Sequence, residues 1–328
     1  IDDILGLSRV TRGNMEHKRL DLGALAVEVA EEILPEDEII RVDTDLILVD
    51  VAVTDEKGKP VRGLRAEDFR LYEDGVERPV AFFNVERRGG ERRPVAVVFA
   101  VDVSGSVSPE EMVRIAQAMR AFTERLDERE SVFALMSFGM SARVLQGFTN
   151  SREKLTKALD KLVREAGSGA STHAYDAVDD AVRLLARRAP RTRVGRPVKR
   201  VVVVVTDGFP VGDTVAPETV IERANAEEVS VYTVTLPSFP RSLAALGRPL
   251  PTPLDVSGLV EKTGGSNVYA TERDFEPLFK SLAEEVVSTY VLAFYPPPEH
   301  RGDGRYRQIR VTTRPGLNVR QSRPGYKS

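Results

Sequence analysis

The chain contains 328 residues and carries a net charge of −3, with 41% hydrophobic and 30% charged residues. This length favours two domains, and this composition is typical of a globular protein. The acidic balance argues against general nucleic-acid binding, and the sequence contains no cysteine, which excludes disulfides, thiol chemistry and cysteine-ligated zinc. The sequence has only three histidines, so we expect any bound metal ion to have oxygen ligands, as Mg²⁺, Mn²⁺ and Ca²⁺ do.

Direct membrane insertion is not expected, because no apolar run reaches the ~18 residues that a membrane helix needs. No signal-peptide pattern opens the chain. The first residue is Ile1 rather than Met, so we expect the true start to be missing from this sequence or to have been removed. Nothing in the sequence predicts an oligomeric state.

Residues 1–38 are expected to form a helical N-terminal extension, because apolar residues recur at helical spacing. The stretch IDDILGLSRVTRGNMEHKRLDLGALAVEVAEE (residues 1–32) resembles the end of a sensor histidine kinase dimerisation hairpin and its linker. The phosphoacceptor histidine motif and the nucleotide-binding boxes of that family are absent from the sequence. We therefore infer no kinase activity, and an ordinary amphipathic extension explains the pattern equally well.

Residues 39–93 are expected to form the first part of a small β domain. Short apolar runs separated by glycine and proline turns are typical of antiparallel strands. The expected strands are 46–53, 68–73 and 80–85. The charged, glycine-containing stretch 87–93 is interpreted as a solvated linker.

Strands and helices alternate over residues 94–288, which predicts an α/β fold with a doubly wound, mostly parallel sheet. The clearest strands are rich in valine and lack polar alternation, as burial on both faces requires. The expected strands are 95–102, 131–138, 142–146, 201–205, 230–236 and 266–270. The expected helices are 109–126, 151–165, 174–188, 217–228, 254–263 and 274–288.

Residues 289–328 are expected to form the second part of the β domain, with strands at 289–295, 305–313 and 318–321. Parallel strands need helical crossovers, which this stretch does not offer. We therefore expect these strands to fold back and pair with those of residues 39–93. The result is a β-sandwich-like domain into which the α/β domain is inserted.

Oxygen-bearing side chains follow the ends of the expected parallel strands. Asp102, Ser104 and Ser106 come at the end of the first strand of the α/β region, Asp207 follows the central valine run, and Thr172 precedes a helix. Because ligands of open α/β sheets bind at the carboxyl ends of the strands, we expect these five side chains to converge. Two carboxylates and three hydroxyls suit a hard, six-coordinate cation that keeps some water.

The pattern Asp-x-Ser-x-Ser at 102–106, with Thr172 after a glycine-rich loop and Asp207-Gly after a valine run, resembles the metal-ion-dependent adhesion site of von Willebrand factor A domains. The resemblance covers residues 94–288 and implies a Rossmann-like fold. It implies that Ser104, Ser106 and Thr172 ligate Mg²⁺, or alternatively Mn²⁺ or Ca²⁺. Asp102 and Asp207 would hold ligands or waters, or ligate directly in one of two states. An Asp or Glu carboxylate of a partner protein would complete the coordination, so the resemblance implies an adhesion or interaction module and not an enzyme.

The flanking stretches resemble a bacterial group of von Willebrand factor A-related proteins found notably in acidobacteria. The stretches that carry this resemblance are LVDVAVTDEKGKPVRGLRAEDFRLYEDG, YVLAFYPP and GRYRQIRVTTRPGLNVRQSRPGY. Proteins of this group are commonly exported, so the resemblance favours secretion or the cell envelope as the location.

Two other functions stay open. A metal-dependent phosphoester hydrolase with an aspartyl nucleophile needs a second carboxylate two residues after the first, where this chain has Ser104. A structural scaffold with an empty site is the other alternative, in which Ser104 and Ser106 are turn residues that cap the following helix.

Three further features have local interpretations. His173 is expected to be a helix-entry residue with no acidic partner fixed beside it. The tripeptide Arg301-Gly302-Asp303 is expected to be a plain turn. The long, proline-rich loop 236–253 lies on the expected metal side, and we hypothesise that Phe239 and Arg241 help to choose the partner.

Overall fold

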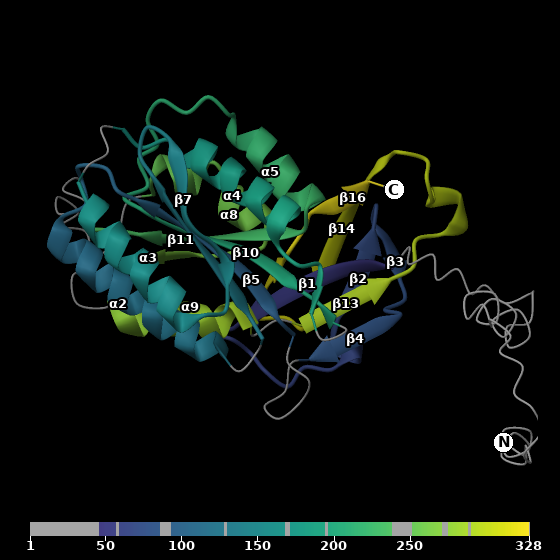
Figure 1. The fold of residues 1–328 in the computed structure, drawn as a ribbon. Helices are drawn as coiled ribbons and strands as arrows, with labels where there is room; N and C mark the ends of the chain where they lie inside the picture. The colour runs from purple at the N-terminus through teal and green to yellow at the C-terminus, as the bar shows by residue number, and fades with distance from the viewer. Residues whose placement is uncertain are drawn as a thin grey trace, which may run out of the picture. The chain divides into compact units, whose positions relative to one another are not determined.

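The computed structural model describes residues 46–56, 59–85, 93–127, 130–167, 171–193, 196–237, 251–270, 275–287 and 290–327 (Figure 1). All of them belong to one compact unit that spans residues 45–328. The expected N-terminal extension 1–38, its kinase-like stretch and most of the linker 87–93 lie outside the described residues. The expected domain boundaries stay predictions.

The central sheet has six strands in the order β12-β11-β10-β5-β6-β7. All neighbours are parallel except β6 and β7, which are antiparallel. The strands are β5 (Val95–Asp102), β6 (Val132–Phe138), β7 (Ala142–Thr149), β10 (Lys199–Thr206), β11 (Val229–Thr235) and β12 (Asn267–Tyr269). The predicted doubly wound, mostly parallel sheet is confirmed. A small hairpin of β8 (Thr192–Arg193) and β9 (Arg196–Pro197), which the sequence did not predict, precedes β10.

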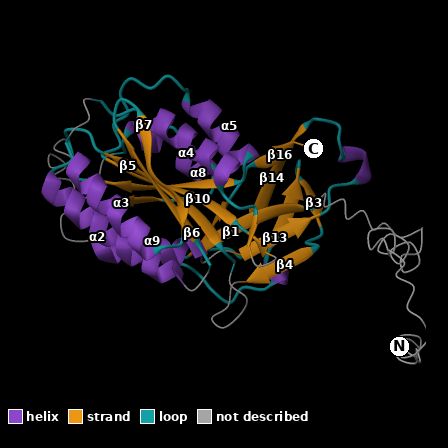
Figure 2. Cartoon of the chain, viewed as in Figure 1, coloured by secondary structure: helices purple, strands orange, loops and turns teal. Residues whose placement is uncertain are grey.

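Helices cover both faces of this sheet (Figure 2). Successive residues of a strand point to opposite faces, so the valine-rich strands feed two separate apolar cores. One core takes in α2 (Pro109–Leu126), α3 (Arg152–Glu165) and α9 (Phe275–Val287). The other takes in α4 (Ala174–Arg188), α5 (Pro217–Ala226), α7 (Pro253–Val256) and α8 (Leu259–Lys262).

The helix boundaries follow local signals, with one correction. Ser108 and Glu111 form a capping box and Pro109 occupies the first turn, so α2 begins where the sequence predicts. The single helix expected over 254–263 is wrong, because Gly258 adopts a positive φ of 74° and separates α7 from α8. A left-handed residue cannot continue a right-handed helix.

The chain before and after the central sheet forms two four-stranded antiparallel sheets, ordered β15-β1-β13-β4 and β16-β14-β2-β3. Their inward-facing residues share one apolar core, which confirms the predicted pairing of N- and C-terminal strands in a β-sandwich-like arrangement. The strands β3 and β16 were not predicted. The strands are β1 (Ile47–Thr54), β2 (Arg70–Glu73), β3 (Val76–Arg78), β4 (Phe82–Val85), β13 (Tyr290–Phe294), β14 (Tyr306–Thr312), β15 (Asn318–Gln321) and β16 (Gly325–Lys327).

Charged side chains join the sandwich to the amino ends of the parallel strands. Arg93, just before β5, donates to Asp50 of β1 at 2.6 Å. Lys199, the first residue of β10, is buried within the α/β part, where its Nζ donates to the carbonyl of Val286 in α9 at 2.8 Å. Two further ion pairs cross this junction, Arg320 with Glu285 and Arg323 with Glu228. The sandwich therefore occupies the amino edge of the central sheet and leaves the carboxyl edge to the loops.

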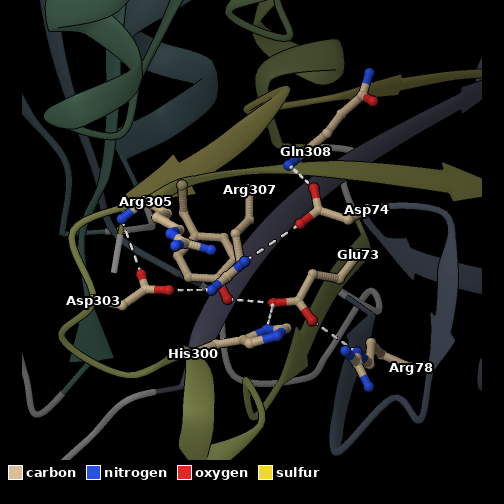
Figure 3. A network of polar contacts seen from close by, with 9 residues as sticks. Glu73, Asp74, Arg78, His300, Asp303, Arg305, Arg307 and Gln308 are labelled. Atoms are coloured by element: carbon tan, nitrogen blue, oxygen red, sulfur yellow. Dashed lines mark hydrogen bonds and ion pairs between the residues drawn. The ribbon is translucent and has the colours of Figure 1, made fainter.

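A polar network lies at one end of the sandwich (Figure 3). The carboxylate of Glu73 is fully buried and accepts hydrogen bonds from Arg78 Nε at 2.7 Å and from the Tyr326 hydroxyl. His300 Nδ1 lies 3.2 Å from the same carboxylate.

The tripeptide Arg301-Gly302-Asp303 forms a turn beside this network. Gly302 has a positive φ of 70° and Asp303 accepts from the Arg305 amide at 2.9 Å. Asp303 also pairs with Arg307, whose side chain is almost buried, so the turn interpretation is confirmed.

Candidate metal centre

The candidate site lies at the carboxyl edge of the central sheet, where β5 and β10 end side by side. From β5 the chain builds β6 and β7 on one side and then returns to place β10, β11 and β12 on the other. Such a reversal of strand order is the place where open α/β sheets bind ligands. The register pairs Val205 with Val101, so Thr206 and Asp102 end neighbouring strands together.

Asp102 is fully buried, and both of its carboxylate oxygens accept hydrogen bonds. Oδ1 accepts from the amide of Ser104 at 2.8 Å, and Oδ2 accepts from the hydroxyl of Thr206 at 2.8 Å. Burial is the largest influence on this carboxyl and raises its pKa, and the nearby charge of Asp207 raises it further. The hydrogen bonds from Ser104 and Thr206 only partly offset this rise. The site therefore holds a buried carboxylate whose negative charge is poorly compensated by the protein.

Ser104 and Ser106 form a pair of hydroxyls in the turn after β5. Their Oγ atoms lie 3.0 Å apart. Ser104 is almost buried, whereas Ser106 is exposed. The Ser104 side chain therefore lies on the inside of the loop and the Ser106 side chain lies at its surface.

Asp207 follows β10 and is 9% exposed. Its Oδ1 accepts from the amide of Phe209 at 3.1 Å. Gly208 has a positive φ of 84°, and a Cβ at this position would lie 2.6 Å from Oγ1 of Thr252. Thr252 caps α7 and bonds to Asp255, so it has little room to move. A glycine is required here both by the backbone angle and by the close approach of Thr252.

Thr172 is 6% exposed and precedes α4. The peptide group between Thr172 and His173 is bonded on both sides. Its carbonyl accepts from the amide of Val211 at 2.8 Å, and its amide donates to the carbonyl of Gly139 at 3.0 Å. A trans peptide points its C=O and N–H in opposite directions, and the described residues contain no cis peptide bond. The β6–β7 turn and the loop after β10 are therefore held on opposite sides of this one peptide.

The loop after β10 is clamped to the start of α4. Asp176 accepts from the amides of Thr214 at 3.0 Å and Val215 at 2.8 Å, and its own amide donates to Asp213 at 2.9 Å. Burial raises the pKa of Asp176, but the bonds from Val215 and Thr214 outweigh this effect and lower it overall. The clamp fixes the loop that begins at Asp207 against the helix that follows Thr172.

The structure thus relates the five predicted residues in three ways. Asp102, Ser104 and Ser106 form one bonded cluster, Asp207 acts on Asp102 through its charge, and Thr172 is tied by its main chain to the loop that begins after Asp207. Among the described residues, no group of three or more His, Asp or Glu side chains is placed to hold a metal ion. A metal site built from these residues must therefore depend on hydroxyl ligands.

Sequence reasoning missed two contributors and misjudged a third residue. Thr206 is not among the five predicted residues, yet it carries one of the two bonds to Asp102. Asp176 was not singled out, although an aspartate in a first helical turn beside a glycine-containing loop is a recognisable signal. His173 was expected to have no acidic partner, and this is wrong, because its Nδ1 lies 3.4 Å from Asp176. The first turn of α4 brings residues three positions apart together.

Residues 96–247 match the family model described as von Willebrand factor type A domain. This chain contains a von Willebrand factor type A domain. Such domains typically mediate metal-dependent protein–protein interactions, and they are generally not enzymes. They often bind a divalent metal ion at their adhesion site.

Several solved structures resemble the domain at low sequence identity. BatB, a conserved hypothetical protein from Bacteroides thetaiotaomicron, is 15% identical, with a TM-score of 0.43 over 58% of this chain and 97% of that chain. The SpRpn10 VWA domain is 14% identical, with a TM-score of 0.40 over 58% of this chain and 94% of that chain. Proximal thread matrix protein 1 from the mussel byssus, solved with a zinc-occupied MIDAS motif, is 17% identical, with a TM-score of 0.45 over 65% of this chain and 48% of that chain.

Among the described residues, no helix has the length and apolarity that are needed to cross a membrane. The loop 236–253, with Phe239 and Arg241, lies largely outside the described residues, so its expected role stays a prediction.

Proposed function

We propose that this chain is a metal-dependent protein-binding module. Asp102, Ser104, Ser106, Thr172 and Asp207 surround a divalent cation, with Mg²⁺ as first choice and Mn²⁺ or Ca²⁺ as alternatives. The site captures an Asp or Glu side chain of a partner protein. The observation that carries the proposal is the 3.0 Å separation of the Ser104 and Ser106 hydroxyl oxygens in front of the buried Asp102.

The spacing of the two hydroxyls suits an octahedral cation. Adjacent ligands at the ~2.1 Å distance typical of Mg²⁺ are about 3.0 Å apart. Both oxygens of Asp102 are already engaged by Ser104 and Thr206, which gives Asp102 the role of orienting the hydroxyls and supplying charge from behind. The raised pKa of Asp102, caused first by its burial, is consistent with a carboxylate that lacks a nearby positive charge.

The ligand chemistry explains why a partner's carboxylate would bind. Serine and threonine hydroxyls are neutral, so they neutralise little of the charge that a dication brings to the site. The cation supplies a Lewis-acidic position that prefers an anionic oxygen. The residues of this chain hold and orient that position, while the partner provides the anion.

A phosphoester hydrolase is the less favoured function. The position that would carry its second carboxylate is Ser104, whose hydroxyl lies 3.0 Å from that of Ser106 and cannot itself act as a general acid or base near neutral pH. We therefore propose a binding module and not an enzyme.

Calorimetric titration of the full chain with MgCl₂ tests the proposal, with MnCl₂ and CaCl₂ as parallel titrations. We expect one site per chain, and a loss of affinity of at least about tenfold in Ser104→Ala and Asp102→Asn. Asp160→Asn, an exposed aspartate of α3, is the matched control and should bind as the wild type does. Absent binding in the wild type, or equal binding in all variants, would overturn the proposed site.

A further inference from the structure

We propose that the candidate metal centre, at the carboxyl edge of the central sheet, selects a partner segment in which one acidic residue is flanked by bulky apolar residues. The apolar residues of the partner would contact Met140 and Val211, which are named here the apolar rim. The inference rests on the proposed function, because the acidic residue is the one that the metal site would hold.

The two rim residues are unusually exposed for large apolar side chains. Met140 is 64% exposed and Val211 is 61% exposed. A single exposed apolar side chain is common on protein surfaces and needs no explanation. Two of them, from loops that meet at one point beside a polar site, indicate a contact surface.

The Thr172–His173 peptide group places the rim residues on both sides of Thr172. It bonds to Gly139, the neighbour of Met140, through its amide, and to Val211 itself through its carbonyl. A segment that brings a carboxylate to the metal site would therefore pass between two apolar side chains.

The rim is held rigidly on the Val211 side. Gly212 has a positive φ of 88°, and a Cβ there would lie 2.6 Å from Nε2 of His173, so the loop packs directly on the imidazole ring. The hydroxyl of Ser171 donates to the carbonyl of Val211 at 2.7 Å. A preorganised surface loses little conformational entropy when it binds, which favours its use for recognition.

The charges beside the rim argue for one acidic residue and against an acidic stretch. Asp176 and Asp213 lie in the clamp of the same loop, and His173 lies against Asp176. On the Met140 side, Arg143 is paired with Glu165 at 2.5 Å. On the Val211 side, a partner with several carboxylates would meet the like charges of Asp176 and Asp213, whereas apolar neighbours would meet Met140 and Val211.

A peptide library with a fixed central glutamate and random flanking positions tests the inference. The full chain is immobilised, and selection is compared in Mg²⁺ and in EDTA. We expect magnesium-dependent enrichment of Leu, Ile, Met or Phe next to the glutamate. Peptides with apolar flanks should bind about tenfold more tightly than serine-flanked versions, because each buried apolar side chain contributes on that order.

The double variant Met140→Ser with Val211→Ser should lose this preference while it keeps the wild-type affinity for Mg²⁺ in calorimetry. Its matched control is Val76→Ser with Phe82→Ser, two exposed apolar residues of the sandwich, which should keep the preference. Magnesium-dependent selection without an apolar preference, or magnesium binding without any selection, would overturn the inference and leave the metal site standing. Absent magnesium binding would instead overturn the proposed function beneath it.

Discussion

The hydroxyl of Thr206 donates a 2.8 Å hydrogen bond to Oδ2 of Asp102, and both side chains are fully buried. The two residues are 104 positions apart in the chain and meet because β5 and β10 are parallel neighbours. Thr206 therefore links the end of one strand to the carboxylate behind the candidate metal centre. Its removal tests how much the site depends on this contact.

Thr206→Val should lower the free energy of unfolding by about 1–3 kcal/mol, because it leaves a buried carboxylate oxygen without its donor. The matched control is Thr235→Val. Thr235 ends the next strand in register with Thr206 and is 1% exposed, but its hydroxyl has no hydrogen-bond partner among the described residues. The control should be neutral or slightly stabilising in urea unfolding. Equal losses in the two variants would show that the bond to Asp102 contributes nothing specific.

Asp176→Ala should loosen the loop after β10. The amides of Thr214 and Val215 lose a charged acceptor, a contribution of about 1.5–3 kcal/mol. Native-state hydrogen exchange of these two amides should accelerate by at least about tenfold. Asp180→Ala, on an exposed position of the same helix, should leave both rates unchanged. Unchanged exchange in Asp176→Ala would show that the clamp does not hold the loop.

Gly208→Ala should destabilise the protein by about 2–4 kcal/mol, from left-handed backbone strain and from the contact with Thr252. Gly302→Ala is the control, because Gly302 also has a positive φ and no atom lies within 4 Å of a Cβ built there. It should cost only about 1–2 kcal/mol. Thermal unfolding in EDTA measures both, and equal losses would mean that Thr252 moves aside.

Glu73 should make the sandwich sensitive to acid. Burial is the largest influence and raises its pKa, but the bonds from Tyr326, His300 and Arg78 together lower it below the ordinary 4.5. A carboxyl whose folded pKa lies below its unfolded pKa stabilises the folded state above the unfolded value. That contribution is lost as the pH falls from about 4.5 through the lower folded value.

Glu73→Gln should therefore flatten the loss of stability below pH 4.5 and should cost about 1–3 kcal/mol at pH 7. Urea unfolding across pH 3–7 measures both effects. Glu77→Gln, at an exposed partner of Arg70, should change the free energy of unfolding by less than about 1 kcal/mol at pH 7. This control should still lose stability below pH 4.5 as the wild type does. If Glu73→Gln loses stability below pH 4.5 as steeply as the wild type, the sensitivity to acid comes from other carboxylates.

Local pattern alone predicted most helices and strands of the central sheet. The run Val95–Asp102 is buried at every position, so it carries a strand signal that no neighbour needs to supply. Ser108 and Pro109 similarly begin α2 through bonds within one turn. The order of strand and helix also predicts a parallel sheet, because a helix between two strands is the crossover that parallel neighbours need. The carboxyl edge then follows, and with it the convergence of Asp102 and Asp207.

The local sequence pattern did not predict contacts between residues far apart in the chain, because each such contact depends on how the whole chain packs. The bond from Thr206 to Asp102 depends on the register of two strands, and a valine run does not specify register when both faces are apolar. The same is true of Met140 and Val211, whose exposure beside Thr172 results from two loops that share one peptide group. Residue types and periods are local properties, whereas the partner of a polar group is chosen by the free energy of the complete fold.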